Sequence, residues 1–170
     1  GTTPVRATDT SVTGDTTLNK TTQYRLGTAG SDTLTGLTLQ NVTFFDATNK
    51  LAGEEKQNYS QTYNSAGTAV LNTTLFYYNG DVRASAASSG KEMIRSQQYR
   101  LGTINSDAIT GLVKQTFSYF AGKEGEEKVN YSQTYTGAAG SETVRNTTIS
   151  WYGTTPVRAT DTSVTGDTTL

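Results

Sequence analysis

Apolar and polar side chains alternate along several short stretches of the chain. Within residues 129–135, Val129, Tyr131, Gln133 and Tyr135 fall on one side of an extended backbone, and Asn, Ser and Thr fall on the other. No stretch sustains the i, i+3, i+4, i+7 spacing of an amphipathic helix. The nearest approach, residues 88–95, is expected to be a loop that leads into a strand. The pattern therefore predicts an all-β fold.

The aromatic residues divide the chain into eight short segments, most of them followed closely by Gly, Asn or Asp. Each segment is also rich in Thr or β-branched residues, as strands are, and the residues between segments are typical of turns. We expect a strand–turn–strand unit at each segment. The segments are residues 21–25, 41–45, 58–63, 72–78, 96–100, 115–120, 130–135 and 146–152.

The sequence repeats itself on two scales. Residues 153–170 are identical to residues 1–18, which gives a period of 152 residues. A shorter period of about 75 residues relates Val5 to Val82 and Val82 to Val157. We expect repeat unit A over residues 1–81, repeat unit B over 82–156, and the start of the next repeat over 157–170. Such nested periods are typical of a tandem array, so the chain is expected to be part of a longer one.

Composition limits how such a chain is stabilised. Hydrophobic residues make up 33% of the chain, below the roughly 45–50% of ordinary globular domains. A thin core fits an antiparallel β-hairpin array, or a β-solenoid or ribbon, in which each unit packs only on its neighbours. The net charge of −1, with 17% charged residues, argues against a nucleic-acid partner bound through bulk electrostatics.

The chain contains neither Cys nor His. This removes thiol nucleophiles, imidazole bases and the usual zinc ligands. The paired carboxylates Glu54/Glu55 and Glu126/Glu127 have no base partner, and we interpret them as solvated charges on sheet edges. We therefore expect no enzyme activity, no cofactor and no metal site. No apolar run is long enough to predict membrane insertion.

Asparagine is the polar residue with a patterned placement. Six Asn residues begin Asn-x-Ser/Thr triplets, the acceptor motif for N-linked glycans, at or near the start of an aromatic segment. Thr pairs such as Thr2-Thr3 and Thr154-Thr155 are further candidates for glycans. Duplication and the abundance of Ser and Thr give the triplets an alternative origin. The six are Asn19, Asn41, Asn58, Asn72, Asn130 and Asn146.

The aromatic residues allow two interpretations. They are either the thin core itself, with hydroxyl groups at its surface, or an exposed row that stacks sugars. The first interpretation is favoured. The residues concerned are Tyr24, Tyr59, Tyr63, Tyr77, Tyr99, Tyr131, Tyr135 and Trp151.

Two segments carry a resemblance to a known family. Residues 77–83 (YYNGDVR) and 151–158 (WYGTTPVR) resemble the Tyr-Asp, or RHS-type, repeats of large bacterial secreted and surface proteins. In place of the family's Asp after Tyr, these segments have Asn79 and Gly153. The resemblance implies stacked β-hairpins and an extracellular bacterial setting.

Together these patterns predict a structural protein, the shaft or filament body of an extracellular microbial surface fibre. The alternative is an adhesin stalk or carbohydrate-binding module that uses exposed Tyr rows. The expected partners are copies of the chain or neighbouring repeats of it, with covalent glycans as a further candidate. Val5, Arg6, Val157 and Arg158 are expected at the junction between repeats, in equivalent environments.

Overall fold

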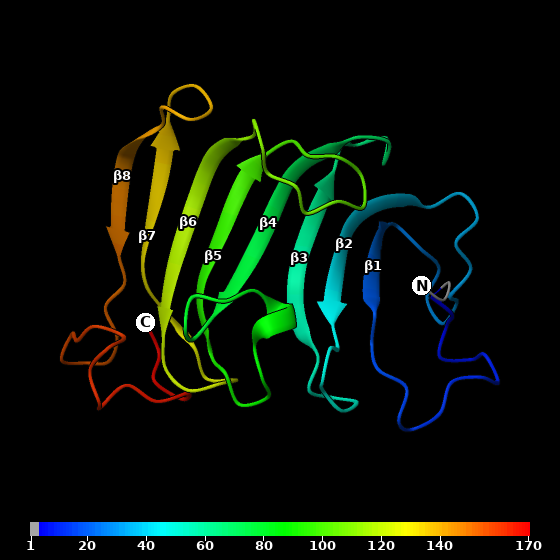
Figure 1. The fold of residues 1–170 in the computed structure, drawn as a ribbon, viewed down its shortest axis with the longest axis horizontal. Coiled ribbons are helices and arrows are strands. Elements are labelled where there is room, and N and C mark those ends of the chain that lie inside the picture. Colours follow the sequence, from blue (N-terminus) through cyan, green and yellow to red (C-terminus); the bar gives the residue numbers. More distant parts are fainter. Residues whose placement is uncertain (1–3) are drawn as a thin grey trace.

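A computed structural model describes residues 4–170; Thr2 and Thr3 lie outside the described residues. In this range eight strands form one antiparallel sheet in the order β1 to β8, each strand pairing with the next along the chain. The sheet is an open meander (Figure 1). The strands are β1 (Lys20–Arg25), β2 (Thr38–Asp46), β3 (Lys56–Tyr63), β4 (Val70–Tyr78), β5 (Met93–Arg100), β6 (Val113–Ala121), β7 (Lys128–Thr136) and β8 (Thr143–Ile149).

The all-β prediction is confirmed, and each aromatic segment lies in or overlaps one strand. The expectation of a strand–turn–strand unit at each segment is wrong, because each segment forms one strand and its hairpin partner is the next segment. Residues 88–92 are a loop that leads into β5, as expected. A short 3-10 turn, η1 (Ala84–Ala86), follows β4 and was not predicted.

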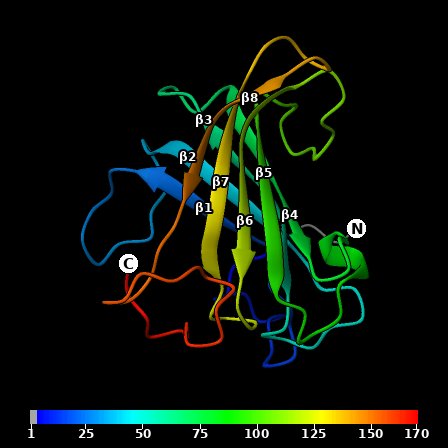
Figure 2. The ribbon, with the colours of Figure 1, turned by 90° about the vertical axis from the view of Figure 1, so that its left-hand side faces the viewer.

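The two faces of the sheet differ in chemistry. One face carries the aromatic and aliphatic side chains, whose central cluster is Tyr59, Leu75, Tyr99 and Phe117. The loop that contains η1 and the loop after β5 lie on one side of the sheet (Figure 2). The opposite face carries small polar residues, for example the cross-strand series Ser96, Ser118, Ser132 and Thr148. The apolar core is therefore a single thin layer between the sheet and its loops.

Strand β8 lies toward one end of the molecule's longest axis and β1 toward the other, with the N-terminal segment beyond β1 (Figure 1). Every residue of β8 is exposed, and β1 is exposed over its first four residues. In contrast, β4 and β5 pair with neighbours on both sides and hold buried residues. In residues 4–170 no helix has the length and apolar character needed to cross a membrane.

Candidate functional site

Strands β4 and β5 form the junction between the two sequence repeats, and Arg83 lies at its centre. Its Nη2 atom donates to the backbone oxygen and the Oδ1 atom of Asn58, at 3.0 and 2.7 Å. The same nitrogen lies 3.0 Å from Asp107 Oδ2. The guanidinium also lies 5.5 Å from the centre of the Tyr77 ring, within cation–π range. One arginine thus links the strand before the junction to the loop after it.

A second contact across this junction is made by Gln61 of β3, whose side chain is fully buried. Its Nε2 atom donates to the backbone oxygens of Thr103 and Ser106, at 2.8 and 3.0 Å. Its Oε1 atom accepts from the Asn105 N–H at 2.9 Å. Because a buried polar group without a partner is costly, these three bonds fix the loop after β5 on the sheet.

Thr73 of β4 completes this contact. Its hydroxyl, fully buried, donates to the Leu101 backbone oxygen at 2.9 Å, and the Leu101 N–H donates to Leu71 O at 2.7 Å. Gly102 packs so closely that an added Cβ would lie 2.1 Å from Thr73 Oγ1. The start of the loop after β5 is therefore held directly against Thr73 of β4.

The C-terminal segment reproduces the first part of this junction on β7. Tyr152 OH donates to Val129 O at 2.8 Å, as Tyr78 OH does to Gln57 O. Arg158 Nε donates to Asn130 Oδ1 at 3.0 Å, which matches the Arg83–Asn58 contact. Val157 is half-buried and forms an isolated bridge with Tyr152.

The N-terminal segment reproduces the second part of the junction, which is the ion pair between arginine and aspartate. Arg6 Nη2 lies 2.5 Å from Asp32 Oδ2, and both side chains are exposed. Asp32 precedes Asp107, and Arg6 precedes Arg83, by one period of the shorter repeat. The Arg6–Asp32 pair therefore corresponds to the Arg83–Asp107 pair, although no strand within residues 4–170 lies beyond it.

The two identical ends have the same local conformation in different surroundings. In each, an Asp Oδ1 atom accepts from a Ser N–H at 2.9 Å (Asp9 from Ser11, Asp161 from Ser163), and a Thr N–H donates to a Thr hydroxyl three residues later at 2.9 Å. The Ser hydroxyls donate to the same Oδ1 atoms at 2.6 Å and are the main cause of the lowered pKa of Asp9 and of Asp161, and the Ser N–H groups lower these pKa values further. Val5 and Arg6 are nevertheless exposed, whereas Val157 and Arg158 are half-buried.

The predicted aromatic residues divide by position. Tyr59, Tyr63 and Tyr99 are buried. Trp151 is 51% exposed, and Arg158 lies over its ring. The remaining four, Tyr24, Tyr77, Tyr131 and Tyr135, are half-buried. The most buried tyrosines therefore lie in the middle of the sheet, and the most exposed aromatic side chain lies beside the β8 edge.

The carboxylates have a role that the sequence analysis missed. Glu55 Oε2 accepts from the Gly53 N–H at 2.9 Å, while its Oε1 accepts from the Leu18 N–H at 2.8 Å. Although burial acts to raise it, these N–H donors hold the pKa of Glu55 below its ordinary value. Glu127 bridges two backbone amides in the same way, because it accepts from the Gly125 N–H and from the Met93 N–H.

Glu142 makes a third such bridge, from Gly140 to Lys114, and the Lys114 N–H is the main cause of the lowered pKa of this carboxyl group. The interpretation of Glu55 and Glu127 as solvated edge charges is therefore incorrect. Each lies in the turn between two strands and receives backbone N–H groups that the sheet leaves unpaired. The repeated Gly-x-Glu spacing is the sequence signal for this role.

The candidate glycan acceptors occupy different settings. Asn19 and Asn146 are exposed, and Asn41 and Asn72 are half-buried in strands. Two others, Asn58 and Asn130, accept hydrogen bonds from Arg83 and Arg158 through their side-chain oxygens. Asn19 is the one candidate that lies outside the strands of residues 4–170, just before β1.

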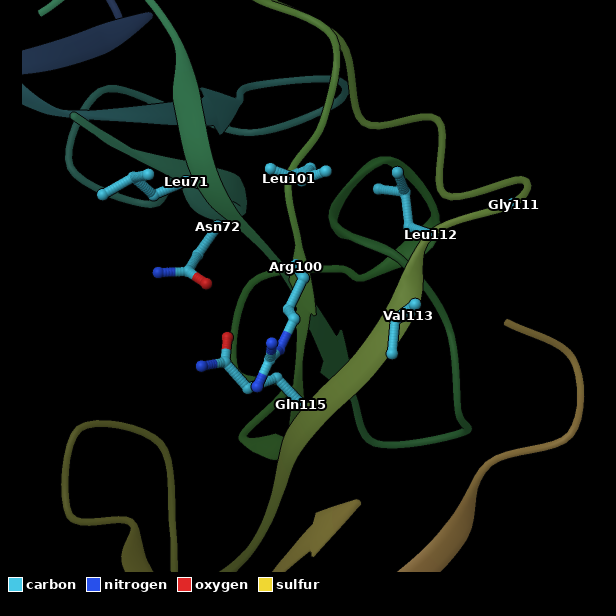
Figure 3. Close-up of a pocket in the computed structure, with 8 residues that line it drawn as sticks. All are labelled: Leu71, Asn72, Arg100, Leu101, Gly111, Leu112, Val113 and Gln115. Carbon is cyan, nitrogen blue, oxygen red and sulfur yellow. The ribbon is translucent and has the colours of Figure 1, made fainter. Parts of the chain in front are cut away.

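A hollow of about 460 Å³ lies beside the β4–β5 junction. Figure 3 shows Leu71, Leu101 and Leu112 toward one end of this hollow and Arg100 and Gln115 toward the other. Its lining includes no aromatic ring that could stack on a sugar. Over residues 4–170 no group of three or more Asp or Glu side chains is placed to hold a metal ion.

The junction contacts recur at the spacing of the shorter sequence repeat. They occur in full between β4 and β5 and in two separate parts at the outer strands.

Comparison with family models, curated protein sequences and solved structures gave no significant match.

Proposed function

We propose that this protein is a structural tandem-repeat protein that forms the shaft or filament body of an extracellular microbial surface fibre. The observation that carries the proposal is the recurrence of the same junction contacts at the spacing of the shorter sequence repeat. Because each strand pairs with its neighbours in the chain, further repeats extend the sheet along one axis without changing its cross-section. The resemblance to Tyr-Asp repeats supports the extracellular setting.

The strands lie across the long axis of the molecule, which sets the length of each repeat (Figure 1). Neighbouring strands in a sheet are about 4.8 Å apart, so the eight strands of one 152-residue unit extend a fibre by about 38 Å. Each of the two diverged halves contributes about half of that length. Length would therefore be adjusted by the number of identical units.

Electron microscopy of native material tests the proposal. We expect unbranched fibres with an axial period of about 38 Å and, in fibre diffraction, a reflection at about 4.8 Å along the fibre axis. Native material that contains only compact particles of one chain would contradict it. An intact mass above that of the bare polypeptide would add covalent glycans to the proposal.

The alternative role as an adhesin stalk stays a prediction. It needs exposed, coplanar aromatic rings, and Tyr59, Tyr63 and Tyr99 are buried in residues 4–170. Specific binding of the chain to a glycan array, lost when Trp151 is replaced by Ala, would favour the adhesin over the shaft.

A further inference from the structure

We infer that β8 pairs with β1 of a following copy of the 152-residue unit, and that a single arginine closes this junction between Asn130 of the first unit and Asp32 of the second. The inference rests on the proposed function, because it names the partner that each outer strand would meet in an array. It also assigns the register of the pairing, which the proposed function leaves open.

The arginine contacts are the first line of evidence. Residue 153 of one unit is residue 1 of the next, so Arg158 and Arg6 are the same position of the array. Arg158 contacts Asn130 at 3.0 Å, and Arg6 contacts Asp32 at 2.5 Å. Arg83 makes both kinds of contact at once. The chain therefore carries each half of one junction at opposite ends, and a following copy would unite them on one side chain.

The glutamine contact gives independent evidence. Gln133 and Thr147 correspond to Gln61 and Thr73, and each pair shows the same Nε2–Oγ1 distance of 3.4 Å. Gln61 also holds the loop after β5, whereas Gln133 has no such loop beside it in residues 4–170. Thr147 is exposed, whereas Thr73 is fully buried.

The loop that would cover Gln133 is already formed at the other end of the chain. Leu26 and Leu101 both have φ of 65°, and the following glycines, Gly27 and Gly102, have φ of 137° and 151°. The two loops also share a turn. The Leu37 N–H donates to Leu34 O at 3.1 Å, and in the same way the Leu112 N–H donates to Ile109 O at 3.0 Å. Leu26 is 93% exposed, against 60% for Leu101 in the complete junction. The second copy would thus dock a preformed loop with little loss of conformational entropy.

The internal junction gives the register. Thr74 pairs with Gln98, and Tyr77 pairs with Arg95. Translated by one repeat, these pairs place Thr148 opposite Gln23 and Trp151 opposite Lys20. Arg95 lies 4.4 Å from the Tyr77 ring centre, so Lys20 is expected to cover Trp151 in the same way. The exposed β8 edge is then shielded by its own repeat, as an unpaired strand edge requires.

Disulfide cross-linking tests the register, since the natural chain contains no Cys. Residues 1–152 are joined to a second copy that spans residues 1–170, with Thr148→Cys in the first unit and Gln23→Cys in the second. The slipped control carries Thr148→Cys with Thr22→Cys, because a one-residue shift moves a side chain to the opposite face of a strand. The matched reference is Thr74→Cys with Gln98→Cys in the single chain, whose pairing the structure defines.

We expect the Thr148–Gln23 pair to oxidise as completely as the Thr74–Gln98 reference, with only background oxidation in the slipped control. The inference is overturned if the reference forms and the Thr148–Gln23 pair does not, or if the slipped pair forms equally well. Trp151 fluorescence in the wild-type two-unit chain gives a readout without cysteines: a spectrum identical to that of the single chain would also overturn it.

These outcomes are separable from those for the proposed function. Fibres with the expected axial period but without the Thr148–Gln23 cross-link would keep the structural role and reject this junction. The cross-link without fibres in native material would keep the junction and reject the shaft.

Discussion

Strands β4 and β8 have closely related sequences and opposite environments. Both contain Asn-Thr-Thr, at residues 72–74 and 146–148, followed by an aliphatic residue. In β4 the residues Thr73 and Leu75 are fully buried, whereas the whole of β8 is exposed. The difference lies in the neighbours, because β4 pairs on both sides and β8 on one. Burial in this sheet is therefore set by the next repeat along the chain and only secondarily by a strand's own residues.

Because the strand residues of one half have counterparts in the other half, matched substitutions can test this difference between β4 and β8. A residue beside the β4–β5 junction should be costly to change, and its counterpart near β1 or β8 should not. Equal effects at both positions would mean that the junction contributes nothing beyond local strand formation.

The largest contrast is expected for Leu75→Ala against Ile149→Ala. Leu75 is 1% exposed and packs in the central cluster, so its truncation should lower the free energy of unfolding by about 2–5 kcal/mol. Ile149 is 42% exposed, and its truncation should change the free energy of unfolding by less than about 1 kcal/mol. Urea denaturation at constant m value measures both. If Ile149→Ala lowered the free energy of unfolding by more than half as much as Leu75→Ala does, the difference between β4 and β8 would be contradicted.

The next contrast sets Gly102→Ala against Gly27→Ala. Both glycines have a left-handed φ, so both changes introduce backbone strain. In addition, the new Cβ at Gly102 would overlap Thr73 Oγ1, whereas at Gly27 no atom lies within 4 Å. The overlap should make Gly102→Ala about 1–3 kcal/mol more destabilising than Gly27→Ala. Thermal unfolding of the two variants under one buffer condition gives the difference. Equal midpoints would show that the loop after β5 is not held against β4.

Gln61→Ala and Gln133→Ala form the third pair. Loss of the Gln61 side chain leaves the Asn105 N–H and two loop carbonyls without their partner, at a cost of about 1–3 kcal/mol. Among residues 4–170 the side chain of Gln133 hydrogen-bonds only to the hydroxyls of Thr147 and Tyr135, so its removal should change the free energy of unfolding by less than about 0.5 kcal/mol. Hydrogen exchange at the Asn105 amide reports the same event locally. Unchanged protection of this amide in the Gln61 variant would refute the role of Gln61.

The strands could be predicted because their signal is local. Thr, β-branched and aromatic residues on alternate positions favour extended backbone wherever they lie, and turn residues separate them. Residues 151 and 152 are the exception. Their aromatic side chains suggested a continuing strand, but β8 ends at Ile149, and Tyr152 instead bridges to Val157.

The junction contacts could not be predicted because their signal is distant. Arg83 contacts residues 25 positions before it and 24 after it, and Gln61 accepts from an amide 44 positions further along the chain. The residues next to Gln61 do not distinguish a fully buried side-chain amide from a half-buried one, since Gln133 has the same flanking sequence. The identity of the segments around the two glutamines was visible, but without the partner loop it did not indicate a binding role.

The smallest expected effect concerns alkaline pH. Burial, with a minor contribution from the Asp107 charge, raises the pKa of Tyr59 from 10.0 to about 12. Burial raises the pKa of Tyr99 to the same level. In the folded chain these hydroxyls keep their protons at pH values where the unfolded chain has released them. The stability that depends on the protonated Tyr59 and Tyr99 hydroxyls is therefore fully present below pH 10 and is lost as the pH rises from about 10 toward about 12.

The absorbance of tyrosinate should accordingly rise in two stages, with the buried group titrating last and together with unfolding. Tyr59→Phe removes one of the late-titrating groups, so it should reduce the steepness with which stability falls above pH 10. Its counterpart Tyr131 lies next to the exposed β8, where burial raises the pKa less far than at Tyr59. Tyr131→Phe should therefore change that steepness less than Tyr59→Phe. The reverse order would show that the outer strands are as well shielded in the single chain as the junction is.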